Sequence, residues 1–480
     1  MRTRGSCWFT CTLLPFLTIA SAAAGQPRNA AAPPRPNVIF ILADDLGYGD
    51  VGCYGQRKIL TPNIDRLAAE GLRFTQAYAG APVCAPSRCV LLTGLHTGHS
   101  HVRDNGELPT EGQRPIPAST VTVAEILKTA GYRTGVVGKW GLGGPGTEGE
   151  PNRQGFDHWF GYLCQREAHR FYPQHLWRDG EKVILEGNAA GRRGQYSHDL
   201  IADEALQFVR DSAAKEAPFF LYLAPTIPHV DLDVPDDSTA PYLGQWEEKP
   251  FPGDHYRAHP TPRAAYAGMI SRLDRDVGRL TALLKELNID ERTLVIFSSD
   301  NGPSYAGGAD AAFFNSAGPL RGLKGSLYEG GIRVPLIARW PGRVRAGTKS
   351  DHACAFWDVL PTLAEVAGAA LPEDLRIDGT SFAPTLLGNT ERQKPHDWMY
   401  WESPARQGLQ AVRMGDWKGV RVGVKRQPPA QIELYNLRDD TAEAKDVAGE
   451  RPEVVAKIER VMREGRTESS IWPLLTSSKG

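Results

Sequence analysis

Two apolar runs of this sequence each lead into side chains that carry oxygen ligands. They are Asp44 and Asp45 after residues 37–43, and Asp300 and Asn301 after residues 293–299. In open α/β sheets ligands bind beyond the carboxyl ends of the strands, so we expect these side chains to meet at one edge. Three carboxylates held close together need a cation, and an all-oxygen set favours Ca²⁺ or Mg²⁺ over zinc. Acids that cap the following turn would show the same spacing, so both interpretations stay open here.

The elements that must hold these acids can be predicted from the apolar pattern. Continuous apolar runs fit strands that are buried on both faces of a parallel sheet, and they occur at residues 37–43, 135–137, 219–223, 293–297 and 334–337. Between them, helices are predicted at residues 62–70, 197–210 and 270–284, and after the capping box of Thr122 and Glu125. Strands that alternate with helices predict an α/β fold, in which a large, mostly parallel sheet is flanked by helices.

The C-terminal part of the chain has a different pattern. Short strand-like segments follow one another closely at residues 398–401, 410–413, 417–421 and 433–435, and a helical segment covers 452–463. Close spacing of short strands is typical of an antiparallel sheet. We therefore predict an α/β domain over residues 37–377 and a smaller α+β subdomain, an antiparallel sheet plus a helix, over residues 378–480.

The N-terminus is typical of an export signal. Arg2 and Arg4 precede a short apolar stretch and then small residues, so residues 1–24 are predicted to be a signal peptide and the Ala- and Pro-rich residues 25–36 a linker. We expect the protein to be periplasmic or secreted, with no membrane span in the mature chain. Five of the seven cysteines lie beyond residue 24, and an odd number in an oxidising compartment implies that one of them has a separate chemistry.

The composition is that of a folded globular protein. The chain has 480 residues, of which 41% are hydrophobic and 23% charged, and its formal net charge is −1. These values exclude a disordered chain, a collagen and a small disulfide scaffold. The near-neutral balance also argues against nonspecific binding to nucleic acid or to anionic membranes, and we expect no nucleic-acid partner.

Cys84 lies in a segment that suggests a reaction. Pro86 can start a helix, which would place Cys84 just before a helix N-terminus, where free N–H groups favour anions. Residues 84–88 resemble the Cys-x-Pro-Ser-Arg signature of the formylglycine-dependent sulfatases, the type I sulfatases of the alkaline phosphatase superfamily. The resemblance continues in order through residues 93–94, 138–140, 228–229, 300–302, 324–331 and 433–437, and so covers nearly the whole chain after the predicted signal.

The resemblance implies a nucleophile, a metal site and catalytic groups. In that family a maturation enzyme oxidises the signature cysteine to formylglycine (3-oxoalanine), whose hydrate attacks sulfur. The implied ligands of Ca²⁺, with Mg²⁺ as an alternative, are Asp44, Asp45, Asp300, Asn301 and the modified Cys84. The implied catalytic groups are Arg88, which braces the nucleophile, Lys139 and Lys324, which neutralise sulfate oxygens, and His229, which protonates the leaving alcohol.

The chain departs from the family pattern at Gly141. The family usually has Gly-Lys-Trp-His-Leu-Gly, whereas this chain has glycine in place of the histidine that would assist breakdown of the sulfated hydrate. The following segment, residues 165–177, is rich in polar and planar side chains that suit a sugar, and Arg166, His169 and His175 are candidate substrate-binding residues. An ordinary surface loop would have the same composition.

These observations predict an exported, calcium-dependent sulfatase that hydrolyses a sulfate ester of a small molecule or, as we expect, a saccharide. One alternative is a phosphodiesterase or phosphonate monoester hydrolase on the same scaffold, because the metal ligands fit both. The other is a noncatalytic protein that binds sulfated sugars with Cys84 unmodified.

Overall fold

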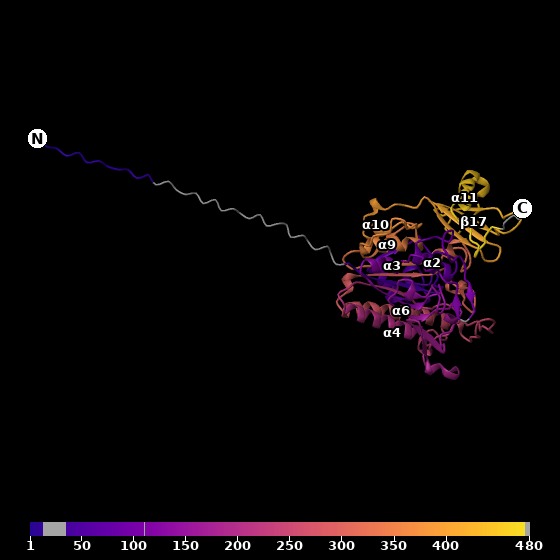
Figure 1. The fold of residues 1–480 in the computed structure, drawn as a ribbon. Coiled ribbons are helices and arrows are strands. Elements are labelled where there is room, and N and C mark those ends of the chain that lie inside the picture. The colour runs from indigo at the N-terminus through magenta and orange to yellow at the C-terminus, as the bar shows by residue number, and fades with distance from the viewer. Residues whose placement is uncertain (13–34, 110, 476–480) are drawn as a thin grey trace. The chain divides into compact units, whose positions relative to one another are not determined.

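A ten-stranded sheet runs through the part of the chain from Arg35 to Gly480 (Figure 1). In spatial order its strands are β13 (Thr348–Ser350), β2 (Leu72–Phe74), β12 (Leu336–Arg339), β11 (Thr293–Ser299), β1 (Asn37–Ala43), β10 (Phe219–Ala224), β6 (Arg133–Lys139), β7 (His158–Tyr162), β8 (His175–Arg178) and β9 (Glu181–Ile184). The neighbours from β11 to β7 are all parallel, whereas β12, β8 and β9 run antiparallel to their neighbours. The computed structural model describes residues 1–12, 35–109 and 111–475.

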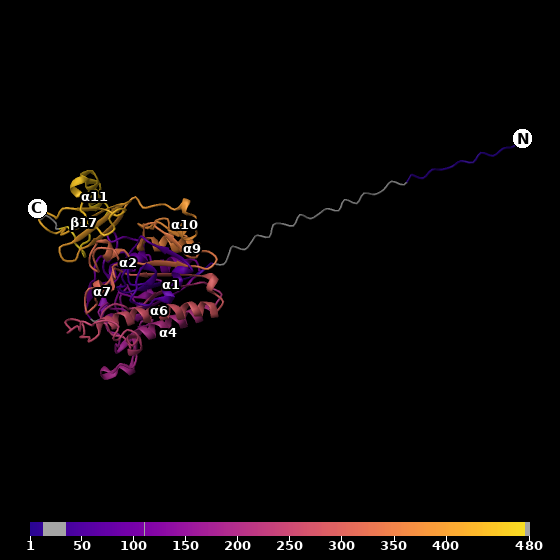
Figure 2. The ribbon, with the colours of Figure 1, turned by 180° about the vertical axis from the view of Figure 1, so that it is seen from behind.

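Helices cover both faces of this sheet (Figures 1 and 2). One face packs against α2 (Cys84–Thr93), α3 (Val123–Thr129) and α9 (Val359–Ala367), and the other against α1 (Pro62–Ala69), α4 (Ser197–Ala213) and α6 (Pro262–Glu286). Alternate residues of β1 enter the two apolar cores: Val38, Phe40 and Leu42 one, Ile39, Ile41 and Ala43 the other. Because both faces of the strand are buried, its sequence is continuously apolar, and the predicted α/β architecture is confirmed.

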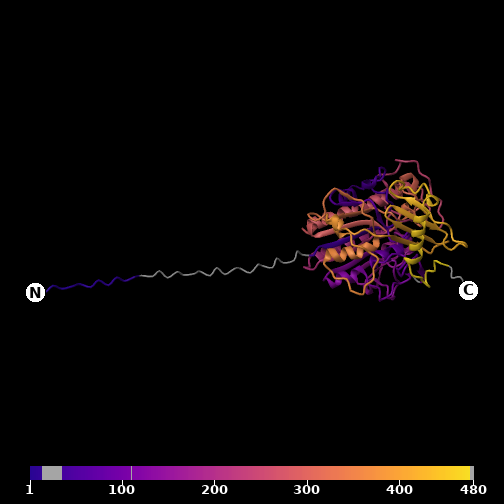
Figure 3. The same ribbon diagram turned by 90° about the horizontal axis from the view of Figure 1, so that it is seen from above.

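The C-terminal strands form a second, antiparallel sheet, as predicted. Its order is β15 (Met399–Ser403), β16 (Leu409–Met414), β17 (Trp417–Val422) and β18 (Glu433–Asn436), and α11 (Pro452–Glu464) packs on one face. The other face shares the core of α2 and α9 through side chains such as Trp401 and Val420. In Figure 3 the strands of this sheet, in yellow and orange, lie beside the central sheet.

Shorter elements complete the described chain. The two-stranded pairs are β3 (Ala77–Tyr78) with β14 (Cys354–Ala355) and β4 (Glu107–Leu108) with β5 (Gly112–Gln113). The short helices are α5 (Asp236–Thr239), α7 (Ala311–Phe314), α8 (Glu329–Ile332) and α10 (Ala383–Leu386). Residues 13–34, which include half of the predicted signal peptide and most of the predicted linker, lie outside the described residues. No helix of the described chain is both long and apolar enough to cross a bilayer.

A buried ionic cluster ties the two sheets together. Lys418 of β17 extends its Nζ atom to 2.9 Å from Glu329 Oε1, at the start of α8, and to 3.0 Å from Glu443 Oε1, and all three side chains are fully buried. Burial alone would raise the pKa of Glu329, but Lys418 and Arg333 hold it at about 2. The C-terminal sheet is thus fixed to the segment that precedes β12.

We predict that Lys418→Met destabilises the protein by about 3–5 kcal/mol, because the buried carboxylate of Glu443 loses its lysine and that of Glu329 keeps only Arg333. Urea unfolding followed by circular dichroism measures the change. The matched control is Lys445→Met, whose exposed ammonium group lies 3.2 Å from Glu450; an exposed pair contributes at most about 1 kcal/mol. Equal effects of the two substitutions would refute the importance of the buried cluster.

Candidate active site

Four neighbouring parallel strands end at one edge of the sheet, and each delivers polar side chains there. They are Asp44 and Asp45 after β1, Asp300 and Asn301 after β11, Lys139 at the end of β6, and His229 in the loop that follows β10. Ala43 pairs with Ser299, and the N–H of Asp300 donates to the carbonyl of Ala43 at 3.0 Å. The parallel register therefore brings together the oxygen-bearing residues that the sequence suggested.

The acids form one buried network. The N–H of Asp45 donates to Asp300 Oδ1 at 3.1 Å, and Asn301 Nδ2 donates to Asp45 Oδ1 at 2.7 Å. Asp45 has a φ of 64°, a left-handed conformation that residues other than glycine adopt at a cost. The strand thus turns sharply at its end and keeps both aspartates within the same cluster.

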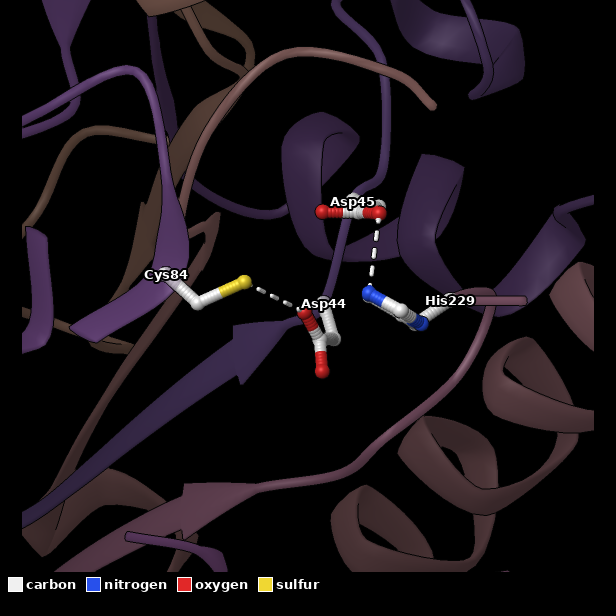
Figure 4. Close-up of side chains that lie close together, drawn as sticks. All are labelled: Asp44, Asp45, Cys84 and His229. Carbon is white, nitrogen blue, oxygen red and sulfur yellow. Dashed lines mark hydrogen bonds and ion pairs between the residues drawn. The ribbon is translucent and has the colours of Figure 1, made fainter. Parts of the chain in front are cut away.

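Cys84 faces these acids from the start of α2 (Figure 4). Its Sγ lies 3.5 Å from Asp44 Oδ1 and 3.6 Å from Lys324 Nζ. The helix begins at Cys84 rather than at Pro86, because a proline in the first turn removes an N–H that has no partner within the helix anyway. Burial raises the pKa of the thiol well above its usual value, with Lys139 and Lys324 opposing it, so the unmodified thiol is neutral at pH 7.

Two lysines form ion pairs with the aspartates. Lys139 Nζ lies 2.6 Å from Asp44 Oδ2, and Lys324 Nζ lies 2.7 Å from Asp45 Oδ2. Burial would lower the pKa of each lysine, but Asp44 and Asp45 respectively raise it, so both stay protonated. Burial likewise would raise the pKa of Asp44, yet the charges around it, Lys139 first, hold it far below its usual value.

Arg88 joins three elements. Its Nη2 and Nε donate to Asp300 Oδ2 at 2.7 and 3.1 Å, and its Nη1 donates to the carbonyl oxygen of Lys139 at 2.9 Å. The guanidinium group is fully buried and lies on α2, one turn after Cys84. Arg88 therefore fixes the start of α2, and with it Cys84, to the ends of β11 and β6.

His229 approaches the acids from the opposite side to Cys84 (Figure 4). Its Nε2 lies 3.4 Å from Asp45 Oδ2, and its Nδ1 contacts the carbonyl oxygen of Val230, an acceptor, so Nδ1 carries the hydrogen. Nε2 is then the atom that can take up or release a proton. Burial, with Lys324, lowers the pKa of His229 well below its usual value.

The three predicted substrate-binding residues lie in different surroundings. His169 stacks on His229 with ring centroids 4.2 Å apart, and so belongs to the site. Arg166 is exposed and pairs with Glu107, and His175 Nε2 lies 2.6 Å from Glu111 Oε1. Arg166 lines a cavity of about 310 Å³ with Glu107, Leu108, Pro109, Glu111, Cys164 and Glu167. Arg166 and His175 thus pair with glutamates around the β4–β5 hairpin rather than with the acid cluster.

The donor set fits a hard divalent cation. Ligand atoms of Asp44, Asp45, Cys84 and His229 all lie within 4.8 Å of one another. Asn301 Oδ1 is buried and has no hydrogen-bond partner among the described residues. Burial, together with Asp44, raises the pKa of both Asp45 and Asp300, the latter to about 6, so the positive charge of the protein alone does not balance the acids. Ca²⁺ and Mg²⁺ bind carboxylate and amide oxygens, and either ion would supply the positive charge that this site lacks.

Sequence reasoning missed two residues, one that contacts Ala85 and one that lies against Gly141. Asn105 Oδ1 accepts the N–H of Ala85 at 3.0 Å, next to the thiol. Gln165 fills the space beside Gly141: a Cβ at Gly141, whose φ is +84°, would lie 1.7 Å from Gln165 Nε2. The glycine at position 141 was the available signal, since a residue that requires both positive φ and an absent side chain marks a close approach.

Comparison with known proteins gives a consistent result. A family profile described as "Sulfatase" matches residues 36–369, and one described as "N-sulphoglucosamine sulphohydrolase, C-terminal" matches residues 323–468. N-acetylgalactosamine-6-sulfatase of Canis lupus familiaris is 34% identical over 420 residues, which are 84% of this chain and 74% of the relative. Human arylsulfatase A is 36% identical over 414 residues, 80% of this chain and 74% of the relative.

Solved structures share the fold. Ps i-CgsB in complex with k-i-k-neocarrahexaose has a TM-score of 0.77 and 32% identity, with 92% of this chain and 95% of the other covered. The phosphonate monoester hydrolase of Agrobacterium radiobacter has a TM-score of 0.63 and 22% identity, with 89% and 94% covered, a likeness of fold alone.

We predict that Gly141→Ala lowers the stability more than Gly146→Ala. Both glycines have positive φ, +84° and +76°, and an alanine there costs about 1–2 kcal/mol, but only Gly141 also meets a neighbour, the Gln165 amide. Thermal unfolding of both variants measures the difference. In a Gln165→Ala background, Gly141→Ala should destabilise the protein no more than Gly146→Ala does. A larger loss at Gly141 in that background would contradict the close approach of Gln165.

Proposed function

The chain belongs to the sulfatase family, the type I sulfatases of the alkaline phosphatase superfamily, and is a sulfuric ester hydrolase; we propose that it acts on a carbohydrate sulfate through a formylglycine made from Cys84 and a bound Ca²⁺. The substrate class is supported by the relative named for N-acetylgalactosamine and by the similar structure with a bound neocarrahexaose. We also propose that the chain is exported to the periplasm or secreted, and that a formylglycine-generating enzyme oxidises it.

One observation carries the proposal: the Cys84 side chain lies between a carboxylate and a lysine at the start of a helix. The raised pKa of its thiol makes an unmodified Cys84 a poor nucleophile at neutral pH. As a hydrated aldehyde, residue 84 would use one hydroxyl to attack sulfur, which breaks the bond from sulfur to the alcohol oxygen and releases the alcohol. The second hydroxyl would then lose its proton and expel sulfate from the first oxygen, which regenerates the aldehyde. The positive end of the α2 dipole, at its first turn, favours the negative charge of the sulfate.

The metal ligands that we propose are Asp44, Asp45, Asp300, Asn301 and the modified Cys84. When bound, the divalent cation supplies positive charge that lowers the pKa of a neighbouring hydroxyl. Arg88 acts through Asp300 and the carbonyl of Lys139, so we assign it a positioning role. It keeps residue 84 and the ends of two strands at fixed separations.

The cations and the histidine would handle the charge of the substrate. Lys139 and Lys324 both lie close to Cys84 and stay protonated, so their ammonium groups can bind the sulfate oxygens. His229 Nε2 would give a proton to the leaving alcohol oxygen. Asp45, 3.4 Å from Nε2, would favour the protonated ring against the burial and the Lys324 charge that lower the pKa of His229. His169, stacked on His229, would face the sugar. Arg166 and His175 would line the outer part of the sugar-binding site.

The function is tested with esters of known composition. We expect the protein, produced with the maturation enzyme, to hydrolyse saccharide sulfates from a panel that includes N-acetylgalactosamine 6-sulfate and sulfated carrageenan oligosaccharides. Mass spectrometry of the peptide around Cys84 should show the aldehyde in place of the thiol, and Cys84→Ala should abolish turnover. Faster hydrolysis of phosphate di- or phosphonate monoesters would favour that alternative. Full activity with only unmodified Cys84 would refute the mechanism, and binding without turnover by aldehyde-bearing protein would favour a binding protein.

The metal is tested by calorimetry. Asp300→Asn should weaken Ca²⁺ binding by about 100-fold or more. Removing a residue that only hydrogen-bonds to a metal ligand already lowers metal affinity about 10- to 100-fold, and Asp300 is itself a proposed ligand. The control is Asp290→Asn, at the other end of β11, whose carboxylate pairs with Arg339 at 2.7 Å; it should bind Ca²⁺ as the wild type does. Full turnover in exhaustively chelated protein would contradict the metal assignment.

A further inference from the structure

Gln165 carries a buried amide that the fold does not use. Its side chain is 4% exposed, and neither Nε2 nor Oε1 has a hydrogen-bond partner among the residues that the structure describes. A buried amide with both of its polar groups unpaired destabilises the folded protein. Native structures keep few such groups, so each one calls for an explanation, and a ligand that pairs with the amide is one.

The strands place this amide at the edge of the sheet where the acids lie. β6 and β7 are parallel with Lys139 opposite Tyr162, and beyond their ends the N–H of Gly141 donates to the carbonyl of Leu163 at 3.1 Å. Gln165 follows two residues later, with its Nε2 against the backbone of Gly141. Its amide therefore lies against a residue that is two positions along the chain from Lys139, the lysine that contacts Asp44.

A second path of contacts links Gln165 to the nucleophile. With its amide in the orientation that satisfies both of its ends, Gln113 accepts the N–H of Gln165 at 3.3 Å and donates to the carbonyl of Gly106 at 3.1 Å. The residue before Gly106 is Asn105, whose Oδ1 accepts the N–H of Ala85. Gln165 is thus linked through Gln113, Gly106 and Asn105 to the residue that follows Cys84, while its amide lies beside Gly141.

The chemistry of the amide selects the ligand. Nε2 can only donate and Oε1 can only accept, so a partner for both must itself accept and donate. Sulfate oxygens only accept, whereas a hydroxyl group does both. We propose that Gln165 is a specificity residue that binds a free hydroxyl group of the sugar, next to the sulfate ester. This inference rests on the proposed function, and it adds the requirement for that hydroxyl.

The proposal also explains why position 141 is glycine. Any side chain there would displace the Gln165 amide, because the Cβ position and Nε2 overlap. The glycine keeps the amide in place, and Gly141 is thus a positioning residue for the same contact.

The test compares Gln165→Met, which keeps the length of the side chain and removes both polar atoms, with the wild type. The substrates are the saccharide sulfate that the wild type cleaves fastest, its analogues with single hydroxyls replaced by hydrogen, and a small aryl sulfate. We expect kcat/KM on the saccharide to fall about 10-fold or more, which is the size of effect that the loss of one or two hydrogen bonds produces. The aryl sulfate should change less than about twofold, and one deoxy analogue should be cleaved equally by both proteins.

Binding gives a readout that needs no turnover. In Cys84→Ala protein loaded with Ca²⁺, calorimetry should show that Gln165→Met weakens binding of the saccharide sulfate about 10-fold and leaves that of inorganic sulfate unchanged. The control is Gln154→Met, which removes a buried amide that donates to the carbonyls of Glu148 and Pro117 at 2.8 and 3.3 Å. It should lower thermal stability without altering the discrimination between substrates.

Two results would overturn the inference. Equal losses on saccharide and aryl sulfate would place the amide on the sulfate or the nucleophile, and no loss on either would make it structural. If the wild type cleaves no sulfate ester, the proposed function fails. The binding experiment then still shows separately whether Gln165 recognises the saccharide.

Discussion

The site depends on the balance of buried charge at one edge of the sheet. Asp44, Asp45 and Asp300 are fully buried and lie within hydrogen-bonding reach of one another or of shared partners, an arrangement that repulsion and desolvation would forbid without cations. Arg88, Lys139 and Lys324 supply them, each from a different element. The parallel register of β6, β10, β1 and β11 gathers the acids and Lys139, while Arg88 and Lys324 reach them from α2 and from the loop before α8. These cations offset only part of the buried negative charge.

Much of this arrangement could be predicted from the sequence because it depends on patterns of neighbouring residues. Strands buried on both faces must be continuously apolar, so β1 and β11 and the acids after them were recognisable, and the confirmed family resemblance rests on short contiguous motifs. The C-terminal sheet was predictable for the same reason, from closely spaced short strands, with boundaries that shifted by one or two residues.

Features set by contacts between distant residues could not be predicted. The helix at Cys84 starts earlier than Pro86 suggested, because proline constrains the first turn without fixing its first residue. The residues of the 165–177 segment differ in surroundings although their composition is uniform: His169 stacks on His229, while Arg166 and His175 meet glutamates. Only the chain path brings Gln165 against Gly141, and no local pattern encodes that path.

The cluster of Glu329, Lys418 and Glu443 bears on how such proteins can diversify. Lys324 lies five residues before Glu329, and the N–H of Gly325 donates to the carbonyl of Pro82, two residues before Cys84. The loop that carries an active-site lysine is therefore held at one end by the nucleophile segment and at the other by a strand encoded about ninety residues later. The C-terminal sheet is not an exchangeable module. Recombination between relatives must inherit the three residues of the cluster together, or lose the geometry around Lys324.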